Sequence, residues 1–306
     1  MLIVVAPGQG SQKPGMFTDW LELPGVADRL DDFGGVAGLD LRRLGSTADA
    51  IEIKDTAVTQ PLVVAAALLA AEQLPLAGSG PVAGHSVGEL AVAALAGVFP
   101  AAAAVALAAV RGAAMGRACA LAPTGMSAVV GGDPDDVLAG LADRDLVGAN
   151  RNGGGQIVAA GPLLALAELA ADPPAGARVI PLAVAGAFHT EYMATAAPEL
   201  ARALAEVPVT DPDRPLLSNS DGATVDSGAR FAELLVQQIT RPVRWDLCQA
   251  TFTRLGVTGI LELPPAGALI GLARRELPGV ATLAVKVPAD LDRAIQFIHE
   301  HTEAAA

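Results

Sequence analysis

Short apolar runs alternate with longer helical patterns along most of this chain. The runs that predict buried strands lie at residues 2–6, 81–86, 216–218, 258–263 and 281–285. Patterns that predict helices lie at residues 61–74, 89–96, 191–207, 229–239, 243–255, 266–277 and 289–301, with Pro61 suited to the first position of its helix. Residues 25–56 are mixed and polar, and only short helices are expected there. The alternation is typical of a mostly parallel sheet with helices on both faces.

The pattern changes at residue 124. From there the chain predicts a strand at 126–130, a helix at 134–141, strands at 146–149 and 156–160, a helix at 162–171 and a strand at 177–184. Asp133 and Pro134 are suited to the cap and first position of the first helix. This βαββαβ order is typical of a ferredoxin-like subdomain. Because the larger alternation resumes afterwards, we expect an α/β protein in which residues 124–186 are inserted between residues 1–123 and 187–306.

Composition narrows the class of protein and its partners. The 306 residues are 52% hydrophobic but only 3% aromatic, so small aliphatic side chains must build the core. A formal charge of −13 argues against nucleic acid or an anionic membrane as a partner. The two cysteines, Cys119 and Cys248, lack metal-ligand spacing and are expected to be buried free thiols. With no basic segment ahead of the first strand, the sequence favours a cytoplasmic protein.

The longest uncharged stretch, residues 90–110, is about as long as a membrane span. It is mostly alanine, and Gly97 and Pro100 interrupt its middle. Two buried helices of a soluble protein explain this stretch better than a membrane-spanning helix does.

The strongest chemical signal is the pentapeptide Gly84-His85-Ser86-Val87-Gly88, between a predicted strand and a predicted helix. This G-x-S-x-G pattern is typical of a nucleophile elbow, in which the serine occupies a strained turn. A side chain at either glycine would crowd the strand against the helix. The turn also places Ser86 and the Val87 N–H at a helix N-terminus, where negative charge is stabilised. The alternative is a plain corner with a chance serine, but the flanking pattern favours a nucleophile.

A serine hydroxyl needs a neighbouring base to react at neutral pH. Of the four histidines, His299 and His301 fall in the last predicted helix. His85 adjoins the serine, and its side chain should point away from it. His189, at the end of a predicted strand, is therefore the expected base, although a lone histidine is more often structural.

Five motifs in order carry a resemblance to a known family. They are Gly8-Gln9-Gly10-Ser11-Gln12, the elbow followed by Glu89, an arginine soon after it, Gly186-Ala187-Phe188-His189 and Arg241-Pro242-Val243-Arg244-Trp245. Together they resemble the malonyl-CoA:acyl carrier protein transacylase family, which includes the acyltransferase domains of polyketide synthases. The resemblance runs over residues 2–285. It implies an α/β-hydrolase-like large subdomain, an inserted ferredoxin-like subdomain and an active site in the cleft between them.

The resemblance also implies residue roles. Ser86 would be the nucleophile and His189 its base. The N–H groups of Gln9 and Val87 would form the oxyanion hole. In the family, a backbone carbonyl near residues 242–244 orients the histidine, so no aspartate is needed.

Substrate choice would depend on Arg111, the family's carboxylate-binding arginine, because a guanidinium matches a malonyl carboxylate bidentately. Without the resemblance, an arginine that extends to water would be the better interpretation. Arg117 lies about 240° further round the same helix, so both cannot face the cleft. Phe188 resembles the malonyl-selective members of the family. Gly186 departs from the histidine often seen in those polyketide domains, and Arg244 stands where some relatives have Gln or Asn.

The predicted function is transfer of a malonyl group from malonyl-CoA to the phosphopantetheine thiol of an acyl carrier protein, through an acyl-enzyme on Ser86. Fatty-acid and polyketide biosynthesis both stay open as pathways. We expect a monomer with no metal and no redox cofactor. One alternative is a thioester hydrolase of the same fold, although the HGGG-type loop and acid of usual hydrolases are not evident. Another is an inactive scaffold, which would have no use for Ser86, His189, Arg111 and Gln9 together.

Acyl carrier proteins are typically acidic, so a chain with a charge of −13 needs a local basic patch to dock one. Arg274 and Arg275 form the densest basic pair in the second half of the sequence. Arg178 matches a basic position in the family. These three arginines are the expected docking residues, and the alternative is that they are solvated surface charges.

Overall fold

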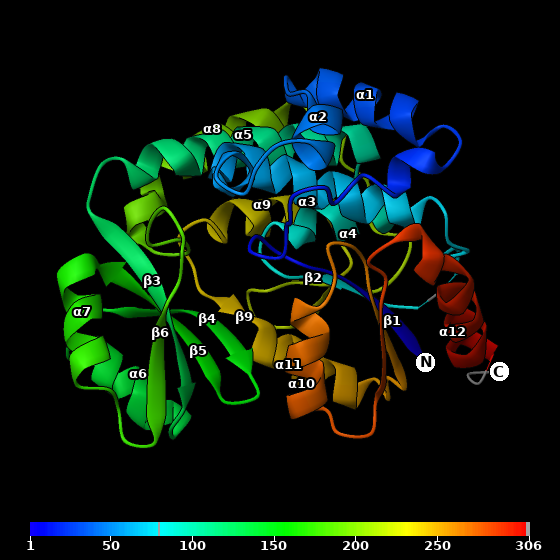
Figure 1. Cartoon of the computed structure of the whole chain (residues 1–306). Helices are drawn as coiled ribbons and strands as arrows, with labels where there is room; N and C mark the ends of the chain where they lie inside the picture. The colour runs from blue at the N-terminus through cyan, green and yellow to red at the C-terminus, as the bar shows by residue number, and fades with distance from the viewer. Residues whose placement is uncertain (79, 304–306) are drawn as a thin grey trace.

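The computed structural model describes residues 1–78 and 80–303 and contains two sheets with helices packed around them (Figure 1). The larger sheet has the strand order β11-β10-β1-β2-β7-β8. Its strands are β1 (Leu2–Ala6), β2 (Val82–Gly84), β7 (Leu216–Leu217), β8 (Thr224–Val225), β10 (Gly259–Glu262) and β11 (Ala281–Ala284). Neighbouring strands are parallel except for β7 and β8. The predicted parallel sheet is therefore confirmed, with one antiparallel strand at its edge.

Strand β1 lies in the middle of this sheet and is buried along its whole length. Its side chains alternate between the two faces, as the pleat of a strand requires. Leu2, Val4 and Ala6 belong to the core on one face, whereas Ile3 and Val5 belong to the core on the other. This explains why the strand is a continuous apolar run.

The smaller sheet has the order β6-β3-β5-β4-β9. Its elements are β3 (Thr124–Gly131), α6 (Pro134–Ala142), β4 (Val147–Gly153), β5 (Gln156–Pro162), α7 (Leu163–Ala171), β6 (Ala177–Pro181) and, later in the chain, β9 (Val243–Arg244). The predicted βαββαβ order is confirmed, and Asp133 caps α6 by accepting from two backbone N–H groups. Strand β9 was not predicted. It pairs in parallel with β4, so the segment expected as one helix from residue 243 forms a short strand first.

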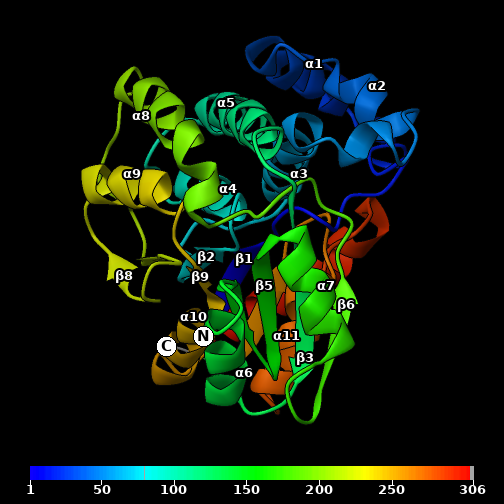
Figure 2. The same ribbon diagram turned by 90° about the vertical axis from the view of Figure 1, so that its left-hand side faces the viewer.

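The remaining helices cover both faces of the larger sheet. They are α1 (Val26–Ala37), α2 (Leu41–Ser46), α3 (Thr56–Ala71), α4 (Gly88–Leu95), α5 (Ala101–Cys119), α8 (Ala197–Ala205), α9 (Gly228–Gln237), α10 (Trp245–Arg254), α11 (Ala268–Glu276) and α12 (Leu291–Glu303), with 3-10 turns η1 (Trp20–Glu22), η2 (Glu52–Lys54), η3 (Glu191–Ala196) and η4 (Pro288–Asp290). In Figures 1 and 2, α3, α4 and α5 lie above the sheet, whereas α10 and α11 lie below it.

Two helix expectations are wrong in detail. Helix α1 has 12 residues, longer than the short helices expected, because Val26, Leu30 and Phe33 form a buried stripe at helical spacing. Helix α3 begins at Thr56, so Pro61 lies inside it rather than at its first position. The Asp55 side chain accepts from the Ala57 N–H, and this cap starts the helix before the proline.

The long uncharged stretch forms two helices, α4 and α5, as predicted. Within the described part of the chain, α5 is the one helix long and apolar enough to cross a membrane by length and composition. Half of the apolar part of α5 is buried inside the protein, as in a core helix.

Candidate active site

The turn between β2 and α4 has the strained geometry predicted for the elbow. Ser86 has a φ of 53°, in the left-handed region that side chains rarely adopt. A Cβ atom added at Gly84 would lie 2.2 Å from the Gly88 carbonyl carbon, and one at Gly88 would lie 2.4 Å from the Ala6 carbonyl oxygen. Both glycines are therefore needed for close packing of strand and helix, as the sequence predicted.

Asn219, which follows β7, holds this strained turn through its side chain. Its side-chain oxygen accepts from the Ser86 N–H at 2.8 Å, and its amide nitrogen donates to the Gly84 carbonyl at 2.7 Å. Because both bonds go to the backbone of the turn, they fix the direction in which Ser86 projects. Asn219 is a residue that the sequence interpretation missed.

His189 lies beside the serine, with its Nε2 atom 2.7 Å from Ser86 Oγ. On the other side of the ring, Nδ1 lies 2.8 Å from the Gln238 carbonyl oxygen. A carbonyl can only accept, so Nδ1 carries the proton and Nε2 is free to accept from the serine hydroxyl. Burial, together with the nearby Arg111 charge, lowers the pKa of His189 to about 3. The imidazole is therefore neutral at pH 7 and able to take a proton.

A backbone carbonyl near residues 242–244 holds His189, as expected. It belongs to Gln238, which follows α9 and lies just before that segment. The segment itself contributes β9, and its Arg244 pairs with Asp246 at 2.9 Å.

Arg111 projects from α5 to the same point and is only 2% exposed. Its two terminal nitrogens donate to Gln60 Oε1 at 2.7 Å and Gln238 Oε1 at 2.8 Å, and one lies 3.4 Å from Ser86 Oγ. Burial lowers the pKa of Arg111 to about 10, against the opposing effect of Glu89, so the guanidinium stays charged at pH 7. Arg117 is exposed and pairs with Glu199 at 2.5 Å, which confirms that the two arginines face different ways.

Glu89 and Gln238 form a polar layer behind Arg111. The two Glu89 carboxyl oxygens accept from the Asn219 N–H and from Gln238 Nε2, each at 2.5 Å. This orients the Gln238 amide with its oxygen toward Arg111. Burial raises the pKa of Glu89 to about 8. The sequence interpretation missed Gln60 and Gln238 and gave Glu89 no role, although each is a polar residue beside an apolar run or a named motif.

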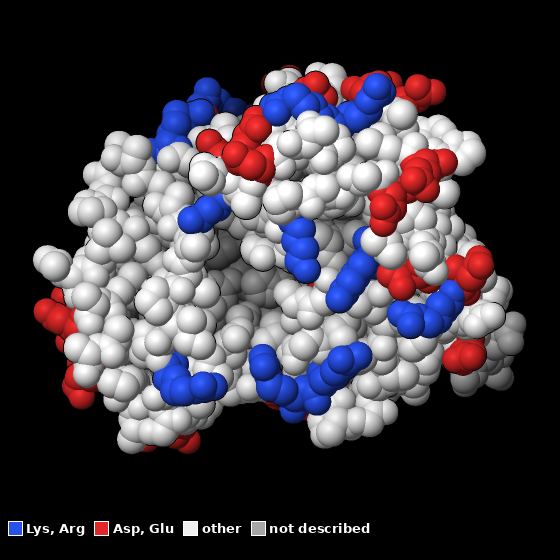
Figure 3. Space-filling view, in the orientation of Figure 1, with Lys and Arg blue, Asp and Glu red and all other residues white. Residues whose placement is uncertain are grey.

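Ser86, His189 and Arg111 line a cleft of about 710 Å³ and form its floor. Figure 3 shows a hollow near the middle of this face, with Lys and Arg side chains around it and most acidic side chains nearer the edges. The cleft is lined from the larger part of the chain by residues such as Gln9 and Phe188, and from the smaller sheet by Asn150 and Asn152. The cleft therefore lies between the two sheets.

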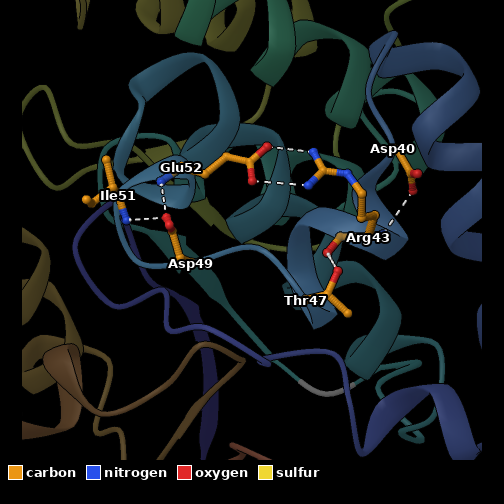
Figure 4. A network of polar contacts seen from close by, with 6 residues as sticks. All are labelled: Asp40, Arg43, Thr47, Asp49, Ile51 and Glu52. Carbon is orange, nitrogen blue, oxygen red and sulfur yellow. Dashed lines mark hydrogen bonds and ion pairs between the residues drawn. The ribbon is translucent and has the colours of Figure 1, made fainter.

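The segment before α3 forms one side of the cleft mouth, where Lys54 lines it. Figure 4 shows the polar network that holds this segment. Arg43 donates twice to the Glu52 carboxylate, at 2.6 and 3.1 Å. Asp49 accepts from the N–H groups of Ile51 and Glu52. Such exposed contacts add little to the free energy of unfolding. They hold the backbone of residues 49–52, which precede Lys54.

The other predicted residues are placed as follows. Gln9 and Val87 both lie at the elbow. Gly8, the residue before Gln9, packs so closely on the turn that a Cβ added there would be 2.8 Å from the His85 carbonyl oxygen. Val87 directly precedes the first residue of α4. Arg275 lines the cleft. The exposed Arg178 and Arg274 lie outside the residues that line it, and Arg274 donates to Thr282.

His85 points away from the serine, as predicted. Its Nε2 atom lies 2.9 Å from Asn152 Oδ1, and its ring packs edge-on against Trp245. Gly186 has a steric reason to differ from the histidine of related domains, because a Cβ there would lie 2.7 Å from Cys119 Sγ. Both cysteines are free, but Cys119, at the end of α5, is only partly buried, whereas Cys248 is buried as expected.

Known proteins are similar to this chain in sequence and in architecture. Residues 3–280 match the family model described as "Acyl transferase domain". A "Malonyl CoA-acyl carrier protein transacylase" from Mycobacterium bovis is 59% identical over 297 residues, which span 95% of this chain and 98% of that protein. This chain belongs to the malonyl-CoA:acyl carrier protein transacylase family.

Solved structures of the transacylase family agree with the fold described above. The crystal structure of MCAT from Mycobacterium tuberculosis has a TM-score of 0.94 and 58% identity, over 96% of this chain and 99% of that one. A malonyl-transacylase solved in complex with its type II PKS acyl-carrier protein has a TM-score of 0.89 and 31% identity, over 96% and 99%. The resemblance drawn from five short motifs is therefore confirmed over nearly the whole chain.

Proposed function

We propose that this protein transfers a malonyl group from malonyl-CoA to the phosphopantetheine thiol of an acyl carrier protein, for fatty-acid or polyketide biosynthesis. The observation that carries the proposal is the meeting of Ser86, His189 and Arg111 within hydrogen-bond distance on the floor of one cleft. A serine beside a neutral imidazole is suited to acyl transfer. A buried guanidinium next to it is suited to an acyl group that ends in a carboxylate. The names of the relatives describe the same reaction.

The reaction has two matched halves. Ser86 Oγ attacks the thioester carbonyl carbon while His189 Nε2 takes the hydroxyl proton. The C–S bond then breaks, and the imidazolium returns that proton to the CoA thiolate. In the second half, the carrier thiol gives its proton to His189 and attacks the acyl-enzyme, and the proton passes to the departing Ser86 oxygen. The Gln238 carbonyl keeps the ring in the tautomer that both halves need.

The N–H groups of Gln9 and Val87 are proposed to stabilise the oxyanion of each tetrahedral intermediate. Within residues 1–78 and 80–303, neither N–H donates to another protein group. Val87 also lies at the N-terminus of α4, where the helix dipole favours negative charge. A single donor of this kind typically contributes about 3–4 kcal/mol to lowering the barrier.

The proposed roles of Arg111 and Phe188 concern the acyl group. Arg111 would hold the distal malonyl carboxylate, with Gln60 and Gln238 keeping the guanidinium aimed into the cleft. Phe188 is 6% exposed and lines the cleft beside the base, where it would limit room for an α-substituent. Together they would favour malonyl over acetyl and methylmalonyl groups.

The division into two subdomains is also part of the proposal, as are the oligomeric state and the cellular location. We propose residues 124–186 as a ferredoxin-like subdomain inserted into an α/β-hydrolase-like subdomain formed by residues 1–123 and 187–306. The strand order β6-β3-β5-β4, with antiparallel pairing throughout, supports this division. We also propose a cytoplasmic monomer that uses no metal and no redox cofactor.

The carrier protein is proposed to dock on the exposed arginines Arg178, Arg274 and Arg275. Arg275 lines the cleft, so it is suited to the phosphate of the phosphopantetheine arm as the arm enters. The basic side chains around the hollow in Figure 3 give this face the local positive charge that an acidic carrier needs.

Product analysis separates this function from a thioester hydrolase. The enzyme is mixed with malonyl-CoA, with or without the phosphopantetheinylated carrier protein, and CoA, malonate and malonyl-carrier are quantified. We expect CoA release in step with malonyl-carrier formation and little malonate. Malonate formation at an equal rate without carrier would assign a hydrolase, and no CoA release in either mixture would assign a scaffold.

A further inference from the structure

A second pocket, which we name the rear pocket, shares a wall with the catalytic residues. It has a volume of about 320 Å³, and Glu89 and Gln238 line it together with Arg151, Arg241 and Arg244. Gln238 also contacts Arg111 and His189 in the cleft. Helix α9 lies above β9 in both Figure 1 and Figure 2, and the turn that joins them supplies part of this wall. The rear pocket is thus separate from the cleft but next to its floor.

The alternation of side chains along β4 explains how an arginine reaches the rear pocket. Asn150 and Asn152 line the cleft, whereas Arg151 between them lines the rear pocket. Arg151 is paired in register with Arg244 of the neighbouring strand β9. Like charges on adjacent strands repel, so this pairing is unfavourable unless negative charge lies nearby.

Of the three arginines that line the rear pocket, only Arg244 forms an ion pair among the described residues. Arg244 pairs with Asp246 at 2.9 Å. In the part of the chain that the structure describes, neither Arg151 nor Arg241 forms an ion pair, and the buried Nε atom of Arg151 has no hydrogen-bond partner. Arg151 and Arg241 therefore line one small pocket without an ion-pair partner within residues 1–78 and 80–303. The Glu89 carboxyl in the same wall does not pair with them, because its two oxygens accept from the Asn219 N–H and from Gln238 Nε2.

We propose that the rear pocket binds a small oxyanion with two negative charges, of the phosphate or short dicarboxylate class, between Arg151 and Arg241. Guanidinium groups bind such anions through paired hydrogen bonds. The pocket, at about 320 Å³, has room for a small anion of this class.

The bound anion would act on the base through the turn at the end of α9. The Arg241 N–H donates to the Gln238 carbonyl at 3.4 Å, and the same carbonyl accepts from His189 Nδ1 at 2.8 Å. An anion that draws Arg241 inward therefore changes the position of the group that orients His189. This effect on the transfer rate rests on the proposed function, but anion binding itself does not.

Isothermal titration of the full chain tests the binding, with inorganic phosphate in one series and succinate in another. We expect saturable one-site binding of at least one anion. Arg151→Gln and Arg241→Gln should each weaken it by about 10-fold or more, because each removes a charge-assisted contact. Arg254→Gln is the matched control, since Arg254 is exposed on α10 and does not line the pocket. Circular dichroism confirms that each variant is folded.

Three results would overturn the proposal. The first is the absence of saturable binding of either anion. The second is an equal loss in Arg254→Gln, which would mean diffuse attraction to surface charge. The third is loss of binding in Arg111→Gln with no change in the Arg151 and Arg241 variants, which would place the anion in the cleft. Because the titration uses no malonyl-CoA, these results are independent of whether the enzyme transfers malonyl groups.

Discussion

The floor and the rim of the cleft are built by opposite means. On the floor, Arg111 is 2% exposed and His189 is 3% exposed. Both terminal nitrogens of Arg111 and both ring nitrogens of His189 meet a named partner or the serine. At the rim, Arg275 is exposed, and so are Arg178 and Arg274, which lie outside the cleft lining. Burial leaves polar groups no water to bind, so each must be satisfied in one arrangement. Exposed charges have no such requirement.

The difference predicts how each region responds to substitution. A change on the floor leaves a buried partner unpaired and removes a group that touches the reacting atoms, so its effect should be large and independent of salt. A change on the rim removes a hydrated charge that acts at a distance, so its effect should be small and screened by salt.

The largest effect is expected for His189→Ala. Without the base that lies 2.7 Å from Ser86 Oγ, the rate of serine malonylation should fall about 10²- to 10⁴-fold. Rapid-quench kinetics with malonyl-CoA alone measures this rate. His299→Ala, an exposed histidine on α12, is the control and should behave like wild type. A loss below tenfold in His189→Ala would mean that another group acts as the base.

Arg111→Ala should follow, with malonyl transfer reduced about 10- to 100-fold through loss of a charge-assisted contact. Acetyl transfer should fall much less, because acetyl has no carboxylate to hold. Arg117→Ala is the matched control on the same helix, since Arg117 is exposed and pairs with Glu199. Initial rates with both acyl-CoA substrates check this. Equal losses for the two acyl groups would show that Arg111 supports the fold and does not select the substrate.

The pH dependence of Ser86 acylation should show the lowered pKa of His189. The pKa of His189 is lowered to about 3 by burial and by Arg111, so the base stays unprotonated well below the usual histidine pKa of about 6.5. Acylation should therefore keep its plateau from pH 7 down to pH 5. In Arg111→Gln the charge is gone, and the acidic limb should move toward higher pH. A wild-type limb at pH 6.5 would contradict the lowered pKa.

The smallest effect is expected at the rim. Arg275→Glu should raise the KM for carrier protein several-fold at low salt, and the increase should shrink at physiological salt. Arg274→Glu should do less, because Arg274 lies outside the cleft lining and donates to Thr282. Acylation by malonyl-CoA should stay within twofold in both. If KM is unchanged in both variants at low salt, the carrier docks elsewhere.

The same contrast explains what could be predicted from sequence. The elbow was predictable because Gly84 and Gly88 occupy positions with no room for a Cβ. Only glycine fits there, so the constraint is visible in the sequence as a short motif. His189 was found by elimination in a chain with four histidines. The βαββαβ order was predictable because its apolar runs are short and separated by clear turn residues.

What was missed depends on contacts between distant segments. Glu89 and Gln238 lie 149 residues apart in sequence, and the bond between them has no signature in either local pattern. Strand β9 is only two residues long and forms because β4 lies beside it. The start of α3 was missed for a local reason, because the Asp55 cap begins the helix at Thr56, five residues before Pro61.

The central claim is that Ser86 becomes acylated on a floor already arranged for malonyl transfer. Intact-mass and peptide mass spectrometry after mixing the enzyme with malonyl-CoA, without carrier protein, tests it most directly. We expect a gain of one malonyl group on the peptide that contains Ser86, removal of that group when carrier protein is added, and no gain in Ser86→Ala. A malonyl adduct that persists in Ser86→Ala, or one on wild type that the carrier cannot remove, would contradict it.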